Sequence, residues 1–244
     1  MSFGVEMSNA DYHAHKAISK SKLDAARKSG KHLYDILYGP PRESTAAFDM
    51  GTVLHASALP GEDADEIAVR MPEGMKKTTK EGKAFVAEHQ GKIILNPSDA
   101  YAIDQMMLSL REHPFSASLV NGELKGKAEQ SFFCTDKETG LELKARPDFI
   151  LDDCSLILDL KTTVDASPKG FQRSVANYRY FVQASHYLDV VEGATGTRPQ
   201  AFLFVAVEKA RPFSTAVYMA DQAMIGLGKQ QAREDLNNIA QWIA

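Results

Sequence analysis

Residues 145–163 read ARPDFILDDCSLILDLKTT. The last part, residues 156–162, is apolar enough to be a buried strand, yet it carries Asp159 and Lys161 two positions apart. Charged side chains in a buried strand are costly unless they are paired, bind a metal or face a cleft. Ten residues separate Asp148, on an expected neighbouring strand, from Asp159. The stretch therefore predicts a sheet that brings two carboxylates and one amine together.

This trio of side chains indicates a divalent metal centre. Two converging carboxylates repel each other, and a cation bound by both removes the repulsion and supplies a Lewis acid. Oxygen ligands favour Mg²⁺ or Mn²⁺ over zinc. Lys161 shares a strand face with Asp159, so its ammonium can stabilise the negative charge that develops in phosphodiester hydrolysis. Because the pattern is short, an exposed Asp–Lys pair on an edge strand beside an unrelated acid is the alternative.

The periodicity of the chain predicts a mixed α/β (α+β) fold with a central mixed β-sheet flanked by helices. We treat residues 1–244 as a single domain, because no linker or repeat divides them. Strands are expected over residues 127–134, 141–151, 156–162, 200–207 and 213–219, with Lys144, Arg146 and Asp148 on one side of the second strand. Helices are expected from the Ser19 and Ser21 caps to Leu37 with a break at Gly30, and over residues 48–59, 84–89, 97–113, 168–191 and 221–242, while residues 61–82 are expected to form a loop.

Composition excludes several classes of protein. The 244 residues are 44% hydrophobic and 25% charged, as in ordinary globular proteins. Two cysteines are too few for a disulfide framework or a cysteine-ligated metal cluster. The first residues lack a basic, apolar leader, and no stretch reaches the length of a membrane span. A cytoplasmic protein without a membrane partner is therefore expected.

The charge is unevenly distributed. The net charge of −4 does not indicate a polyanionic partner. However, residues 16–31 carry six basic side chains against one acid, and residues 75–83 read MKKTTKEGK. Such stretches either follow the phosphates of a nucleic acid or form solvated surfaces.

Five ordered motifs carry a resemblance to a known group of enzymes. Pro147-Asp148, ten residues and Asp159-Leu160-Lys161 resemble the motif that gives the PD-(D/E)xK nuclease superfamily its name. The helical segment GTVLH at residues 51–55 resembles an element of RecB-like and RecE-like nucleases. Glu129 stands where that branch has an additional acid, and QASHY at residues 183–187 resembles the Q-x-x-x-Y helix of the RecB group. TGLELKARPD at residues 139–148, with DLKTT, is similar to the exonuclease VIII (RecE-type) family of phages and prophages.

The resemblance extends over residues 19–207 and implies a fold and an activity. The fold would have a restriction-endonuclease-like core. The activity would be Mg²⁺-dependent exonuclease digestion of linear double-stranded DNA, with Mn²⁺ as a possible substitute and two ions per site. Digestion would run 5′ to 3′ and leave 3′ overhangs for phage-type recombination by strand annealing. A ring-shaped homo-oligomer, a trimer or tetramer, and a RecT-type single-strand annealing protein would be the partners, in the cytoplasm of a bacterial host.

The resemblance also assigns roles to individual residues. The implied catalytic residues are Asp148, Asp159, Lys161 and Glu129; the implied metal ligands are His55, Asp148, Asp159 and the backbone carbonyl of Leu160; and the implied DNA contacts are Gln183, Tyr187, Thr162, Arg146, Lys76 and Lys77. Other roles stay open for some of them: Gln183 and Tyr187 either contact DNA or brace the site, Thr162 either binds a phosphate or favours the strand, and His55 and Glu129 also suit ordinary helix and strand positions.

Three rival functions are compatible with the sequence. They are a structure-specific endonuclease of the same fold, a non-catalytic DNA-binding module, and a metal-dependent hydrolase of small nucleotides. The complete set of two acids and a lysine favours catalysis over simple binding. The lack of a cysteine quartet makes the iron–sulfur members of the superfamily a poor match.

Overall fold

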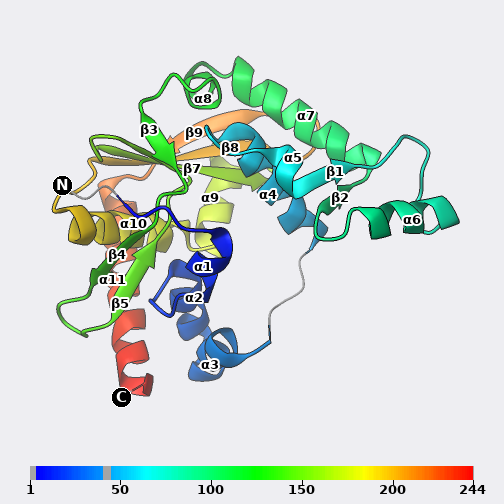
Figure 1. Ribbon diagram of the computed structural model, residues 1–244. Coiled ribbons are helices and arrows are strands. Elements are labelled where there is room, and N and C mark those ends of the chain that lie inside the picture. The colour runs from blue at the N-terminus through cyan, green and yellow to red at the C-terminus, as the bar shows by residue number, and fades with distance from the viewer. Residues whose placement is uncertain (1–3, 41–44, 244) are drawn as a thin grey trace.

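The computed structural model describes residues 4–40 and 45–243 (Figure 1). Its strands are β1 (Ala68–Arg70), β2 (Ile93–Leu95), β3 (Gly126–Ala128), β4 (Phe132–Thr135), β5 (Glu142–Ala145), β6 (Phe149–Leu151), β7 (Leu156–Thr163), β8 (Ala201–Glu208) and β9 (Thr215–Met219). Its helices are α1 (Asn9–Ala14), α2 (Lys20–Lys28), α3 (Gly30–Tyr38), α4 (Ala46–Ala58), α5 (Ala64–Ile67), α6 (Lys80–Glu88), α7 (Pro97–Glu112), α8 (Pro114–Val120), α9 (Pro168–Asn177), α10 (Tyr180–Thr195) and α11 (Gln222–Ile243).

A mixed five-stranded sheet forms the centre, in the order β3-β6-β7-β8-β9. Strands β7 and β8 pair in parallel over their full length, whereas β6 and β9 are antiparallel to their neighbours. Parallel neighbours require a crossover connection, and here α9 and α10 supply it. The mixed sheet flanked by helices that the sequence predicts is confirmed.

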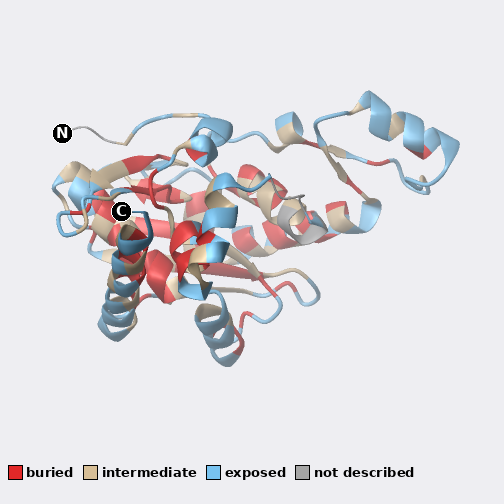
Figure 2. Cartoon of the chain, turned by 90° about the horizontal axis from the view of Figure 1, so that it is seen from below, coloured by how far each residue is buried: buried red, intermediate tan, exposed pale blue. Residues whose placement is uncertain are grey.

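Helices cover both faces of this sheet, and the side chains of its strands alternate between them. On β8, Phe202 and Phe204 pack with residues of α2, α9, α10 and α11, whereas Val205 packs with residues of α4 and α7. On β7, Leu158 and Leu160 belong to the α4–α7 side. Side chains in a strand alternate, so the intervening charged residue 159 points to the α10 side. The buried residues run through the middle of the molecule in Figure 2.

Both strands of the expected long hairpin are interrupted, so the expectation of two continuous strands is wrong. The break between β3 and β4 includes Glu129, which has a left-handed backbone with φ of 50°. The break between β5 and β6 falls at residues 146–148. Strands β4 and β5 consequently form a two-stranded sheet of their own. Lys144 and Arg146 do share a side, over the ring of Tyr12, but Asp148, the last residue of the break, contacts β7 instead.

The helix expected over residues 168–191 is also divided. It breaks into α9 and α10 at Arg179, whose backbone is left-handed with φ of 52°. A non-glycine residue in this conformation needs support from its surroundings. The break expected near Gly30 is confirmed, since Ser29 separates α2 from α3 in an extended conformation. Helices α4, α7 and α11 and strands β8 and β9 match their predicted segments within a few residues.

The segment expected to be a loop, residues 61–82, contains α5 and β1. Strand β1 pairs in parallel with β2, and α6 lies between them in the chain. We call residues 68–95 the arm, because they project from the body in Figure 1. The arm is mostly exposed in Figure 2. None of the described helices is both long and apolar enough to cross a membrane.

Helix α11 packs against α10 through a glycine. A Cβ atom added at Gly228 would lie 2.0 Å from the carbonyl oxygen of Phe181 and 2.9 Å from the Cβ of Ser185. Because Gly226, two residues earlier, is exposed, an added Cβ there meets nothing within 4 Å. Close packing therefore requires a glycine at position 228, whereas no contact requires one at position 226.

We expect opposite effects of alanine at these two positions. Gly228→Ala should lower the free energy of unfolding by about 1–3 kcal/mol, because α10 and α11 must separate to admit the methyl group. Gly226→Ala should raise it by roughly 0.5–1 kcal/mol, because alanine loses less backbone entropy in a helix. Urea unfolding of both variants measures the difference. Equal stabilities would contradict the close packing of α10 on α11.

Candidate active site

The candidate site lies where β6 stops pairing with β7. The last paired residues are Phe149 and Leu158. Beyond them, the carboxylate of Asp148 replaces a main-chain partner, and its Oδ2 accepts a hydrogen bond of 2.7 Å from the N–H of Leu160. The edge of β7 is therefore open at the charged residues, and Asp148 is fixed against it.

His55 of α4 lies against the same carboxylate and against the main chain of β7. Its Nε2 lies 2.9 Å from Asp148 Oδ2 and 2.9 Å from the carbonyl oxygen of Leu160. Its Nδ1 lies 2.8 Å from the carbonyl oxygen of Gly51, and since a carbonyl only accepts, Nδ1 is the donor. One imidazole nitrogen and two oxygens from three different elements therefore converge.

This arrangement favours the protonated, positively charged form of His55. Burial opposes a charge on the ring, but Asp148 and its hydrogen bond outweigh burial and raise the pKa of His55 to about 9. Burial likewise opposes the charge on Asp148, yet His55 and Lys161 hold the pKa of Asp148 below its ordinary value. A positive charge is thus stabilised at the point where the three atoms meet.

The buried Asp159 and the half-buried Lys161 form an ion pair next to this point. The side chain of Asp159 is 0% exposed, and its Oδ2 accepts a hydrogen bond of 2.6 Å from Gln183 Nε2. Its Oδ1 faces the Lys161 ammonium, and no group in the described residues completes a hydrogen bond of normal geometry to it. The Lys161 ammonium also lies 5.0 Å from the ring centre of Tyr180. The predicted shared face of Asp159 and Lys161 is confirmed.

The electrostatics join the two acids and the lysine into one cluster. Burial raises the pKa of Asp159, Lys161 opposes this increase, and Asp148 adds to it. Burial opposes the charge on Lys161, but Asp159 and Asp148 outweigh it and raise the pKa of Lys161. The charges of the two acids and the amine thus influence one another, and Asp159 and Lys161 are in direct contact.

The donor set fits a divalent cation. Two carboxylates, a main-chain carbonyl and one imidazole are ligands that Mg²⁺ and Mn²⁺ accept. The buried Oδ1 atom of Asp159 is paired with the Lys161 ammonium, so a positive group already lies against this carboxylate. In the described part of the chain, no three His, Cys, Asp or Glu side chains alone are arranged to hold a metal. The Leu160 carbonyl is therefore needed to complete the set around His55 and Asp148.

Glu129 lies beside this cluster, although not on the continuous strand that we expected. Its N–H donates to the carbonyl oxygen of Asp148 at 3.1 Å. Burial and then the charge of Asp148 raise its pKa, whereas His55 and Arg146 oppose the increase. Its left-handed backbone ends β3 and turns the residue toward the site. Glu129 is thus a neighbour of Asp148.

Two residues expected to contact DNA are instead buried. Gln183 is 7% exposed, and its amide holds Asp159, so the bracing role describes it. Arg146 is 8% exposed, and it donates to Ser131 Oγ and to the carbonyl oxygen of Met7. The assignment of Arg146 to DNA binding is therefore corrected: its guanidinium fixes the N-terminal segment to the start of β4.

The other four residues that were expected to contact DNA lie in different parts of the molecule. Tyr187 is half-buried and packs edge-on against Phe202, with ring centres 6.2 Å apart. Thr162 is half-buried on β7, on the side of α4. Lys76 and Lys77 are exposed on the arm, where Lys77 donates to the carbonyl oxygen of Ile94. Tyr187 borders the central cluster: burial, followed by Tyr12, Asp159 and Asp148, raises its pKa well above the ordinary value, and a hydrogen bond with Gln183 opposes this increase.

Sequence reasoning missed Tyr180. It lies one helical turn before Gln183, so both side chains project from α10 toward β7. The signal was present in the spacing of three between the two residues, but it could be interpreted only once the break before α10 was known.

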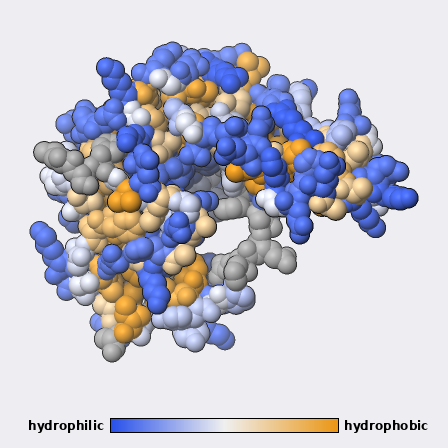
Figure 3. Space-filling view, in the orientation of Figure 1, coloured by the Kyte–Doolittle hydropathy of each residue, from blue (hydrophilic) through white to orange (hydrophobic). Residues whose placement is uncertain are grey.

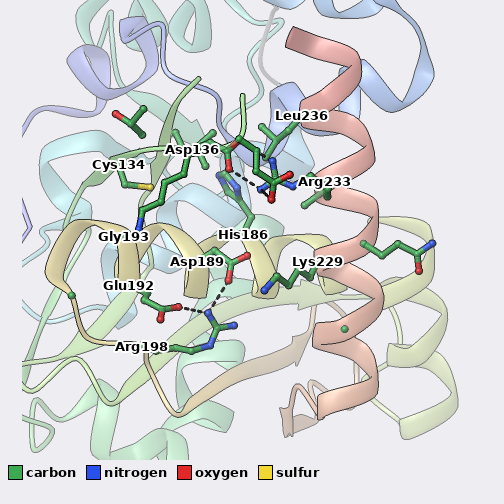
Figure 4. Close-up of a pocket in the computed structure, with 18 residues that line it drawn as sticks. Cys134, Asp136, His186, Asp189, Glu192, Gly193, Arg198, Lys229, Arg233 and Leu236 are labelled. Atoms are coloured by element: carbon green, nitrogen blue, oxygen red, sulfur yellow. Dashed lines mark hydrogen bonds and ion pairs between the residues drawn. The ribbon is translucent and has the colours of Figure 1, made fainter. Parts of the chain in front are cut away.

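A separate cavity of about 970 Å³ lies between the β4–β5 turn, α10 and α11 (Figure 4). Figure 4 shows Arg198 directed toward Asp189 and Glu192, and Arg233 directed toward Asp136. Its charged walls are thus largely paired with each other. No residue of the metal-ligand set lines it, so the candidate site is elsewhere.

The sequence of the chain matches a known protein family. The family model of a PDDEXK-like domain of unknown function (DUF3799) matches residues 19–244. The chain belongs to this family. PDDEXK nucleases generally use divalent metal ions, and the family and fold support a nuclease. A search of curated proteins found no match.

Solved structures similar to this PDDEXK-like chain include three proteins named as exonucleases. A protein from Eubacterium rectale, provisionally named an exonuclease, has a TM-score of 0.69 and 12% identity, over 98% of this chain and 87% of its own. A phage related exonuclease from Haemophilus somnus 129PT has a TM-score of 0.36 and 15% identity, over 80% and 93%. An alkaline exonuclease from Laribacter hongkongensis has a TM-score of 0.33 and 12% identity, over 72% and 91%. The first likeness shows a shared fold.

The ligand set predicts how the PDDEXK-like chain binds metal. His55→Ala and Asp148→Asn should each weaken Mn²⁺ binding by about tenfold or more, because even residues that only orient metal ligands contribute about tenfold. Isothermal titration calorimetry with Mn²⁺ measures the change. Asp152→Asn is the matched control, since this carboxylate is exposed in the turn between β6 and β7. Binding that is unchanged in both site variants would exclude this location.

Proposed function

We propose that the chain is a Mg²⁺-dependent exodeoxyribonuclease that digests linear double-stranded DNA from 5′ to 3′ and leaves 3′ overhangs. The observation that supports this function best is the convergence of His55 Nε2, Asp148 Oδ2 and the Leu160 carbonyl oxygen beside the Asp159–Lys161 pair. Binding alone would not require a half-buried lysine paired with a fully buried acid. A cation site and a positioned amine are both groups that stabilise the charge developing during phosphodiester hydrolysis.

Each side chain has a role in this proposal. Asp148, Asp159, the Leu160 carbonyl and His55 would hold the cations, two per site, with Mn²⁺ as a substitute for Mg²⁺. Bound there, the cations would supply Lewis acidity for the attack of water on phosphorus. Lys161 would orient that water and stabilise the charge that develops on the phosphate oxygens. Glu129, whose raised pKa reflects burial beside Asp148, would hold water at the edge of the site.

Three further contacts keep the amine of Lys161 in place. Asp159 pairs with it, Gln183 fixes the other oxygen of Asp159, and the ring of Tyr180 lies beneath the ammonium. A hydrogen bond and a cation–π contact restrict the rotation of both charged groups. The pair therefore meets a substrate already oriented, which is what positioning contributes to catalysis.

The arm supplies a surface for the DNA backbone. Lysines 76, 77, 80 and 83 lie on it, and hydrophilic side chains follow its edge in Figure 3. A chain with net charge −4 needs such a local basic surface to approach DNA. Continuous digestion would also need a way to stay on DNA, so we propose a ring-shaped homo-oligomer, a trimer or tetramer. A RecT-type annealing protein would then receive the 3′ overhang.

A nuclease assay with end-labelled linear duplex and a covalently closed circle tests the proposed activity. With Mg²⁺, the wild type should shorten the linear duplex from its 5′ ends and leave the circle intact. Asp159→Asn should abolish digestion, and Lys161→Met should reduce kcat by roughly 10²–10³-fold, as loss of a positioned charge-stabilising donor does. The control Asp152→Asn should digest at the wild-type rate.

Other outcomes identify the rival functions. Cleavage of the circle would indicate a structure-specific endonuclease. DNA binding without hydrolysis in Mg²⁺, Mn²⁺ or any other divalent metal would indicate a binding module. Hydrolysis of free mononucleotides with none of DNA would indicate a small-nucleotide hydrolase.

The salt dependence of DNA binding tests the arm. Each lysine that neutralises a phosphate adds about 0.9 to the slope of log affinity against log salt. Simultaneous Lys76→Ala, Lys80→Ala and Lys83→Ala should therefore lower that slope by roughly 2–3. The matched control replaces the exposed Lys137 and Lys229, which lie around the cavity near α11. An unchanged slope in the arm variant would mean that the arm does not contact the phosphates.

A further inference from the structure

A ladder of aromatic rings leads outward from Lys161 to solvent. The ring of Phe204 is buried in the sheet, and Tyr180 stacks on it with ring centres 5.6 Å apart and planes at 26°. Tyr178 in turn stacks on Tyr180, with centres 5.6 Å apart and planes at 24°. The Lys161 ammonium lies 5.0 Å from the centre of the middle ring. The ladder thus begins in the core, passes the ion pair of the site and ends at Tyr178.

The last ring of this ladder is exposed. Tyr178 is 61% exposed, although one of its faces is already stacked. Its backbone caps the end of α9, so it belongs to a helix junction and not to a long loop. A flat aromatic ring in water, supported from behind, offers the surface on which another planar group can stack.

The backbone that carries Tyr178 is fixed by several charged groups. The ammonium of Lys20 donates to the carbonyl oxygen of Tyr178 at 2.6 Å. The next residue, Arg179, is left-handed, and its guanidinium donates to Asp24 at 3.0 Å and to the fully buried Asp235. A left-handed arginine and a buried ion pair both cost free energy. The junction that holds the exposed ring of Tyr178 therefore contains two features that lower the stability of the fold.

Three basic side chains lie near the stacked rings, and each of them is paired with an acid. Lys20 pairs with Asp24, Arg179 pairs with Asp24 and Asp235, and Lys161 pairs with Asp159. Phosphates on either side of a stacked base would meet these basic side chains. Aromatic rings beside basic side chains are the combination that binds single-stranded nucleic acid.

We propose that Tyr178 is a stacking platform for an unpaired nucleobase of the strand that is cut at Asp159 and Lys161. This inference rests on the proposed nuclease function and adds the form of substrate that the site accepts. A base can lie flat on Tyr178 only after it has left its pair and its neighbours in the duplex. The site would therefore engage a frayed end, and the stacked base would lie within a nucleotide or two of the scissile phosphate.

Fluorescence of 2-aminopurine tests the platform without requiring hydrolysis. The probe replaces the first, second or third nucleotide from the end of the cut strand in separate duplexes, and Ca²⁺ replaces Mg²⁺. The wild type and Tyr178→Phe should quench one of these positions. Tyr178→Ala should lose this quenching and bind roughly tenfold more weakly, the effect of removing one base–aromatic stack. Tyr34→Ala is the control, because Tyr34 is equally exposed, at 66%, on α3.

A kinetic cycle with Mg²⁺ separates stacking from a general structural effect. An abasic nucleotide at the quenched position should raise KM by the same factor as Tyr178→Ala, and the two changes together should raise it no further. A terminal mismatch should lower the KM of the wild type and leave that of Tyr178→Ala unchanged. Thermal unfolding should give Tyr178→Ala nearly the wild-type Tm, because the ring is exposed.

The results distinguish the two proposals. Quenching that is absent, or that persists in Tyr178→Ala, would overturn the platform even if the wild type digests DNA. Quenching that depends on Tyr178, in a protein that hydrolyses no DNA with any divalent metal, would overturn the nuclease and retain the platform.

Discussion

The hydrogen bond from the N–H of Leu160 to the carboxylate of Asp148 is the contact on which the candidate site depends. A strand cannot use the same main-chain group for its neighbour and for a side chain. Strand β6 therefore stops pairing at Phe149, and the edge of β7 opens at the position where its charged residues begin. The same opening leaves the carbonyl of Leu160 free to face His55. The interruption of the hairpin is thus what places a side chain of one strand against the main chain of the next.

The second constraint is the burial of Asp159. A fully buried carboxylate is costly, and its ammonium partner loses its hydration as well. Helix α10 offsets part of this cost with the amide of Gln183 and the ring of Tyr180, both from its first turns. Those turns start where they do because Arg179 ends α9 and is held by acids of α2 and α11. Contacts between distant helices therefore determine how the ion pair of β7 is oriented.

The sequence predicted the parts of the structure that local pattern controls. The alternation in residues 156–162 placed Asp159 and Lys161 on one face, and the spacing from Pro147-Asp148 placed the second acid beside them. The breaks at Glu129 and Arg179 were not predictable, because nothing local marks a non-glycine residue for a left-handed backbone. Arg146 was misassigned because a surface arginine and a buried one look alike in sequence. Its burial follows from the N-terminal segment that folds over it, a contact between residues far apart in the chain.

Leu160 contributes to the site in a way that its side chain does not reveal. The isobutyl group is 1% exposed and packs into the core beneath α4, whereas the peptide groups on either side of it supply a donor to Asp148 and an acceptor to His55. Every genetically encoded amino acid except proline carries both groups. Substitutions at residue 160 other than proline would consequently change only how the side chain packs. They would not reveal what the main-chain groups contribute to the site. Replacing the amide by an ester through chemical synthesis is the kind of change that would expose the contribution of the backbone.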